Sequence, residues 1–244
     1  MIAVLGFLAA AVSISVVWPQ VWRSCRHGRT VGLSPTSSWL NVGLNLCWLT
    51  FGLLTGDPAQ ILTHVAVGAG NTAVLAAQLL TQPHLRSPRT LMRTAAGAAG
   101  LAVLAVGSLG AVVLLGATPA VVAGTLGAVI GLIGAAGAVV QPFGLLMDRS
   151  QDLSGLSPTR WRLGAGSCAL WTTYGLLIAQ PTVWLSAGFE LARALVMCML
   201  LRPRPAVQSV GVLAELRPAL ASADGRLAEG HVGQRVRRPV LAAA

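Results

Sequence analysis

The sequence contains very few charged residues and no lysine. Only 10% of its 244 residues are charged, against roughly a quarter in soluble domains. Hydrophobic residues make up 55% of the chain, and the mean hydropathy is +0.72. An ordinary soluble domain has too little interior to bury this much apolar surface, so the composition excludes that class.

The residue patterns of catalytic and metal sites are missing as well. We find no Ser-His-Asp grouping, no paired-carboxylate site and no cluster of metal ligands. The glycine-rich run at 124–137 lacks the lysine that follows a phosphate-binding loop. Four cysteines, none with the spacing of a zinc or redox motif, stand at Cys25, Cys47, Cys168 and Cys198. We therefore expect no enzyme activity, no metal site and no cofactor.

The sequence has, instead, apolar blocks about as long as the roughly 20 residues that cross a bilayer as helix. The blocks comprise residues 2–22, 36–55, 59–81, 94–116, 120–146, 161–179 and 182–201. They lack the alternation typical of barrel strands. The sequence thus predicts an all-α membrane protein with seven transmembrane helices. The polar remainder, 202–244, is expected to be a cytoplasmic tail that is disordered or rests on anionic lipid through its arginines.

All 17 basic residues are arginine, and they give the chain a net charge of +10. Every arginine except Arg193 lies in the tail or in the connections at 23–29, 86–93 and 149–162. The alternate connections, near Asp57, Gly116 and Gln180, contain none. Since arginine-rich flanks stay cytoplasmic, we expect a multi-pass plasma (inner) membrane protein with its N-terminus outside and its C-terminus inside. The expected partner of this charge is the lipid bilayer, not nucleic acid.

An internal repeat divides the chain. The letters GLSPT occur at 32–36 and again at 155–159, an offset of 123 residues. At this offset Pro19 falls on Pro142, Trp48 on Trp171, Gly52 on Gly175 and Pro58 on Pro181. Each repeat, 1–81 and 120–201, contains three helices, and the block at 94–116 is a linker. Because the linker crosses once, we expect a 3+1+3 arrangement of two parallel triple-helix bundles.

The motifs of the first repeat resemble the PQ-loop superfamily. They are Trp18-Pro19-Gln20, the loop GLSPT, the letters WLTFG at 48–52, and Pro58 at the start of the third helix. The 3+1+3 layout is similar to the SWEET branch, whose half-size bacterial relatives are the SemiSWEETs, and the resemblance covers about residues 1–202. It implies a transporter whose pocket is lined by a Trp from the second helix of each repeat, here Trp48 and Trp171. Where the family carries Asn on the third helix, this chain has His64 and Ala187.

Polar side chains inside the apolar blocks predict where a pocket lies, because exposing them to lipid is costly. Residues that share helical faces are Asn41, Asn45 and Trp48 on the second block, Gln60, His64, Asn71 and Gln78 on the third, and Ser186, Glu190 and Arg193 on the seventh. We expect these faces to form a central pocket for a small-molecule substrate. For Asn45 and Gln78, a hydrogen bond that merely joins helices is an equal alternative.

One proline inside the first helix of each repeat predicts a hinge. Proline removes a helical hydrogen bond and weakens the preceding turn. The hinge positions are Pro19 with Gln20, and Gln141 with Pro142, where the order of the two residues is reversed. A static kink is the alternative.

Glu190 and Arg193 lie three residues apart on a helix and are placed to neutralise each other. If Arg193 instead extends towards the cytoplasm, Glu190 is left in a low-dielectric site suited to a proton or a cationic group. His64 is a second candidate proton carrier.

The sequence therefore predicts a membrane transporter that moves a small polar solute, sugar-like or amino-acid-like, by alternating access around a midplane pocket. The alternative is a non-transporting PQ-loop membrane receptor or accessory protein. The identity of the substrate, proton coupling and the oligomeric state, a homo-oligomer included, stay open.

Overall fold

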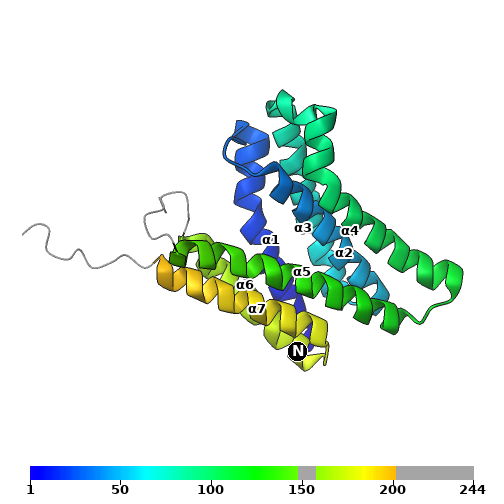
Figure 1. The fold of residues 1–244 in the computed structure, drawn as a ribbon. Coiled ribbons are helices and arrows are strands. Elements are labelled where there is room, and N and C mark those ends of the chain that lie inside the picture. The colour runs from blue at the N-terminus through cyan, green and yellow to red at the C-terminus, as the bar shows by residue number, and fades with distance from the viewer. Residues whose placement is uncertain (148–157, 202–244) are drawn as a thin grey trace, which may run out of the picture. The chain divides into compact units, whose positions relative to one another are not determined.

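A computed structural model of the chain describes residues 1–147 and 158–201. The side chains of residues 137–147, Pro158 and Arg160 lie outside the described part, as does the tail at 202–244. The described residues form helices and no strand (Figure 1): α1 Ile2–His27, α2 Pro35–Thr55, α3 Pro58–Thr81, the short 3-10 helix η1 Pro83–Arg86, α4 Pro88–Leu115, α5 Pro119–Met147, α6 Pro158–Leu177 and α7 Pro181–Leu200. The predicted all-helical fold is confirmed for these residues.

Proline and glycine set the ends of these helices. Every α-helix after α1 begins with proline, whose missing N–H costs nothing at the first helical position. The residues that end α1, α2 and α4 are Gly28, Gly56 and Gly116, with φ of 61°, 65° and 67°, a conformation that only glycine adopts without strain. Two predicted boundaries were consequently wrong. Helix α1 continues five residues past 22 and α4 begins six residues before 94, because the caps end a helix and the apolar block does not.

The third helix of each repeat lies between the other two. Helix α3 packs against both α1 and α2, and α7 packs against both α5 and α6. Gly52 and Gly175, which are related by the repeat, provide the same close approach in both. A Cβ on Gly52 would lie 3.0 Å from Gln60 Cβ, and one on Gly175 would lie 2.7 Å from the backbone nitrogen of Trp184. Helix α4 packs against α2. Between the repeats, α1 contacts α6 and α2 contacts α5.

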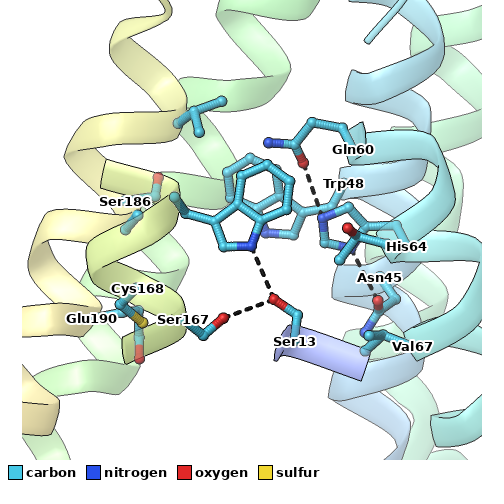
Figure 2. A pocket seen from close by; sticks show the side chains of 14 residues that line it. Ser13, Asn45, Trp48, Gln60, His64, Val67, Ser167, Cys168, Ser186 and Glu190 are labelled. Carbon is cyan, nitrogen blue, oxygen red and sulfur yellow. Dashed lines mark hydrogen bonds between the residues drawn. The ribbon is translucent and has the colours of Figure 1, made fainter. Parts of the chain in front are cut away.

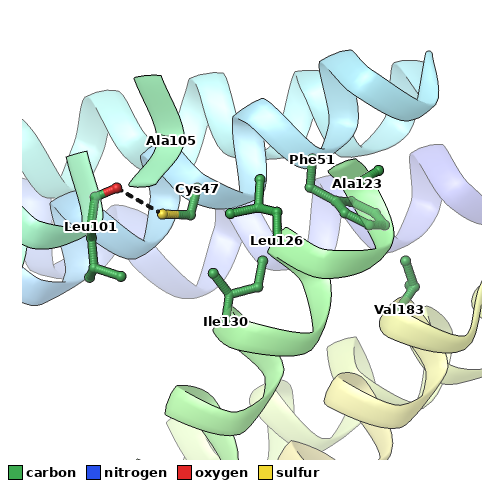
Figure 3. Close-up of a cluster of buried hydrophobic side chains, with 8 residues drawn as sticks. All are labelled: Cys47, Phe51, Leu101, Ala105, Ala123, Leu126, Ile130 and Val183. Atoms are coloured by element: carbon green, nitrogen blue, oxygen red, sulfur yellow. Dashed lines mark hydrogen bonds between the residues drawn. The ribbon is translucent and has the colours of Figure 1, made fainter. Parts of the chain in front are cut away.

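The apolar core lies where α2, α4, α5 and α7 meet. Figure 3 shows its buried side chains, which are Cys47, Phe51, Leu101, Ala105, Ala123, Leu126, Ile130 and Val183. Within the core the Cys47 thiol donates to the carbonyl oxygen of Leu101 over 3.2 Å. The core therefore joins α4 to α2 on one side and to α5 and α7 on the other.

Four described helices are long and apolar enough to cross a membrane: Ile2–His27, Pro88–Leu115, Pro119–Ala136 and Pro181–Leu200. The other three, α2, α3 and α6, carry most of the polar side chains described below. Membrane-spanning helices thus support a multi-pass membrane protein, and the count of seven spans remains a prediction.

Candidate functional site

A cavity of about 280 Å³ lies between the two repeats. Helices α1, α2 and α3 supply one wall, and α6 and α7 supply the other (Figure 2). Of the residues predicted for the site, Trp48, Trp171, Asn45, His64 and Glu190 line this cavity. These five come from four helices, which only the tertiary structure brings together.

The lining follows the internal repeat. Within the described part of the chain, twelve of the fourteen lining residues form pairs at the offset of 123, namely Asn45/Cys168, Trp48/Trp171, Gln60/Val183, Thr63/Ser186, His64/Ala187 and Val67/Glu190. Only Ser13 and Ser167 have no repeat partner in the lining. The two repeats therefore present equivalent backbone positions to one cavity but different side chains. The first repeat contributes amides and an imidazole, and the second contributes a carboxylate.

His64 is held between two side-chain amides. Its Nδ1 lies 3.1 Å from Asn45 Oδ1 and its Nε2 lies 3.1 Å from Gln60 Oε1. Asn45 donates its own amide N–H to the carbonyl of Asn41 over 3.0 Å, so its oxygen accepts from His64 Nδ1. A neutral imidazole then needs a donor at Nε2, which Gln60 supplies only by turning its NH₂ group inward. The tautomer of His64 and the orientation of the Gln60 amide are therefore coupled.

The two tryptophans of the repeat differ in their surroundings. Trp48 stacks on the His64 ring at 5.8 Å between centroids and 12° between planes, and its indole N–H donates to no group in the described residues. The indole N–H of Trp171 donates to Ser13 Oγ over 2.9 Å. Trp48 thus keeps a free donor at the cavity, whereas Trp171 has none.

Ser13 joins the two repeats through its hydroxyl. It donates to the carbonyl of Ala9 over 2.9 Å, so the 2.7 Å contact with Ser167 is a bond in which Ser167 donates. Helix α6 therefore places two donors, the Ser167 hydroxyl and the Trp171 indole N–H, on the Ser13 hydroxyl oxygen of α1 (Figure 2). We did not predict Ser13 or Ser167, because an isolated serine in an apolar block carries no signal of its partner.

Glu190 and Arg193 form the intrahelical ion pair that their spacing allows. The Arg193 guanidinium also lies over the Trp161 ring, 5.1 Å from its centroid. These contacts hold Arg193 beside Glu190, so the alternative in which it extends to the cytoplasm is not the arrangement observed. Glu190 lines the cavity and Arg193 does not.

A cross-repeat contact lies at the end of the molecule where α3 and α7 begin. The Tyr174 hydroxyl lies 3.1 Å from both carboxylate oxygens of Asp57. Asp57 also caps α3 by accepting from the backbone N–H groups of Ala59 and Gln60 at 2.9 and 3.2 Å. Gly6 leaves room for the ring, since a Cβ there would lie 2.7 Å from Tyr174. The turn between α2 and α3 is thereby fastened to α6.

Two predicted binding residues lie outside the cavity. Asn41 has an exposed side chain and Asn71 a half-buried one, and neither lines the cavity. Both are nearer the arginine-rich end of their helices, beyond the depth at which the cavity lies. Asn41 takes part only through its backbone carbonyl, which accepts from Asn45.

The predicted hinge positions lie within helices. Helix α1 runs through Pro19 without interruption, and Gln20 donates its amide N–H to Ser24 Oγ over 2.9 Å. Helix α5 likewise continues past 142 to Met147, but the side chains of Gln141 and Pro142 lie outside the described residues. Hinge motion at either position stays a prediction.

Residues 1–61 match the PQ loop repeat family. The match covers α1, α2 and the first turn of α3, and it includes Pro19-Gln20 and Trp48. The resemblance to the PQ-loop superfamily is therefore confirmed over this range. No curated protein matches the chain.

Proposed function

We propose that this protein is a membrane transporter that carries a small polar solute by alternating access around the cavity between its two repeats. The observation that carries the proposal is the lining itself, in which six pairs of repeat-related positions face one central space. Parallel repeats around a central binding site are a recurrent transporter design, because rocking one repeat against the other exposes the site to either side in turn.

The packing of the helices supports the 3+1+3 arrangement. In each repeat the third helix separates the first from the second, and α4 lies against α2 outside the cavity. Helices α2, α3 and α6, which fall short of the apolar character of a free-standing span, each place polar side chains in the shared cavity. This favours seven spans, with the arginine-rich connections on the cytoplasmic side.

The cavity restricts the size of the solute. Its volume of about 280 Å³ lies near the lower end of the roughly 300–1,000 Å³ range of small-molecule sites. We therefore propose a small solute, such as a single sugar ring or an amino acid. Trp48 and Trp171 offer aromatic surface, while Gln60, Ser186 and Glu190 offer hydrogen-bonding groups.

The Tyr174–Asp57 contact supports a closed state at one end of the passage. It joins the second repeat to the first at the predicted outer surface, where repeats that rock apart must separate. Breaking it opens the cavity to that side, and Pro19 and Pro142 are proposed to accommodate the movement at the other.

The experiment is a screen of the purified protein for thermal stabilisation by sugars, amino acids and organic cations, followed by uptake of each hit into liposomes. A solute that binds raises the melting temperature by mass action. Trp48→Ala and Trp171→Ala should each weaken binding at least tenfold while the protein still folds. Trp184→Ala, on α7 but outside the cavity lining, is the matched control.

The outcomes separate the candidate functions. Normal binding by both cavity variants would show that the tryptophans are packing residues. A solute that binds but is never taken up would identify a receptor and refute transport.

A further inference from the structure

Two hydroxyl groups that line the solute cavity can only accept a hydrogen bond from a ligand. The Thr63 hydroxyl donates its proton to the carbonyl of Ala59 over 2.7 Å, and the Ser167 hydroxyl donates its proton to Ser13 over 2.7 Å. A hydroxyl group has one proton and two lone pairs, so each oxygen keeps an acceptor site once its proton is committed. These two positions therefore recognise donors on a ligand.

The Gln60 amide adds a further acceptor when His64 is neutral. His64 Nε2, 3.1 Å from the Gln60 side chain, then needs a donor, and the Gln60 NH₂ group supplies it. The other terminal atom of Gln60, which points away from His64 (Figure 2), is then the carbonyl oxygen. Gln60 lines the cavity, so this oxygen is available to a donor on a ligand.

Glu190 gives the cavity a negative charge. It supplies the one carboxylate in the lining, and no lysine or arginine is among the described residues that line the cavity. Arg193 contacts Oε2 of Glu190 and lies over the Trp161 ring, outside the lining. Oε1 of Glu190 accepts no hydrogen bond from any described residue. The ion pair therefore presents its negative end to the cavity.

The two tryptophans of the lining favour a ligand of the same charge. Trp48 and Trp171 come from opposite walls, and the faces of their rings attract cations. A cation that enters the cavity loses its water, and the Glu190 carboxylate, the acceptor oxygens and the ring faces offset that cost. An anion, or the carboxylate of an amino acid, would be buried without a cationic partner.

We propose that the solute is a small protonated amine without an anionic group. Its N–H groups donate to Glu190 Oε1 and to the acceptor oxygens of the lining, and its carbon skeleton lies against Trp48 and Trp171. This inference rests on the proposed function, because it takes the cavity to be the site of the carried solute.

The test measures binding to the purified full chain by titration calorimetry at neutral pH, where the amines are protonated. Each of two probe sets shares a ring and differs in one group: cyclohexylamine, cyclohexanol and cyclohexanecarboxylate, and glucosamine, glucose and glucuronate. In at least one set the amine should bind about tenfold or more tightly than the other two members, the change expected for one charge-assisted hydrogen bond. Because the ring is shared, the ratio reports the charged group and not the size of the probe.

Glu190→Gln should abolish the preference for the amine, because it keeps the shape of the side chain and removes its charge. The double change Glu190→Gln with Arg193→Met removes the whole ion pair and should abolish the preference in the same way. It tests the site if the single change, which leaves Arg193 without its partner, does not fold. The matched control is Asp57→Asn, which removes a carboxylate that lies outside the lining and should keep the preference.

The results separate this inference from the proposed function. A neutral or anionic probe that binds as tightly as its amine, no binding of either amine, or a preference that survives both Glu190 variants would overturn the amine site, as would its loss in Asp57→Asn. If an amine binds with the expected preference and is not taken up into liposomes, transport is refuted and the site stands. If glucose or glucuronate binds most tightly and is taken up, transport stands and the amine site is wrong.

Discussion

Removing the hydroxyl group of Tyr174 should open the passage at its Asp57 end. One O–H proton is shared between two carboxylate oxygens, each 3.1 Å away, so Tyr174→Phe deletes one charge-assisted hydrogen bond. Such a bond contributes about 1.5–3 kcal/mol, and we take the low end, about 1.5 kcal/mol, because Asp57 is partly exposed. At about 1.4 kcal/mol per tenfold change, the open state becomes about tenfold more populated. The backbone groups that Asp57 caps are untouched, so α3 should remain intact.

The native thiol of Cys168, which lines the cavity, provides the assay. In a background with Cys25 and Cys198 changed to Ser, an impermeant thiol reagent added outside intact cells should modify Cys168 about tenfold faster in Tyr174→Phe. Thr173→Val is the control, because the neighbouring hydroxyl bonds only within its own helix. An unchanged rate in Tyr174→Phe, or an equal increase in Thr173→Val, would show that the contact does not hold this end closed.

Three further changes test other parts of the structure. Ser13→Ala removes the hydroxyl that accepts from the Trp171 indole and should weaken solute binding several-fold at unchanged maximal uptake. Ser15→Ala should not, because the Ser15 hydroxyl bonds within α1. Equal effects of the two changes would contradict the cross-repeat role of Ser13. Gly175→Ala should destabilise the protein by about 1–3 kcal/mol through overpacking, while Gly100→Ala, with nothing within 4 Å, should be neutral or stabilising in thermal unfolding. Because Glu190 is ion-paired, a pH gradient should not change the uptake of solute into liposomes, and the Glu190→Gln protein should melt at a lower temperature. If the wild type accumulates solute along a pH gradient and Glu190→Gln does not, the Glu190 carboxyl takes up a proton instead.

The helices were predictable because their signals are local. An apolar block of about 20 residues, a proline at its start and a glycine after its end specify a helix without reference to the rest of the chain. The errors at the end of α1 and the start of α4 have the same origin. The prediction followed hydropathy, whereas Gly28 and Pro88 decide where the backbone stops or begins to be helical.

The candidate site was predictable only where the repeat or an intramembrane polar group marked it. Trp48, Trp171 and His64 carried such marks, and all three line the cavity. Asn41 is also a polar residue on the predicted face, but its side chain lies away from the cavity. Helical phase predicts which face a residue occupies and not how far along the helix the cavity lies.

The helices and the side chains available on each helical face could be read from the sequence because both follow from local backbone geometry. The repeat could be read from it because the same letters recur 123 residues apart. The tertiary structure alone decided which faces meet. Ser13 with Trp171, and Asp57 with Tyr174, are 158 and 117 residues apart. Their contacts depend on how α1 and the α2–α3 turn pack against α6, and this packing is a sum of many small interactions that no short stretch of sequence encodes.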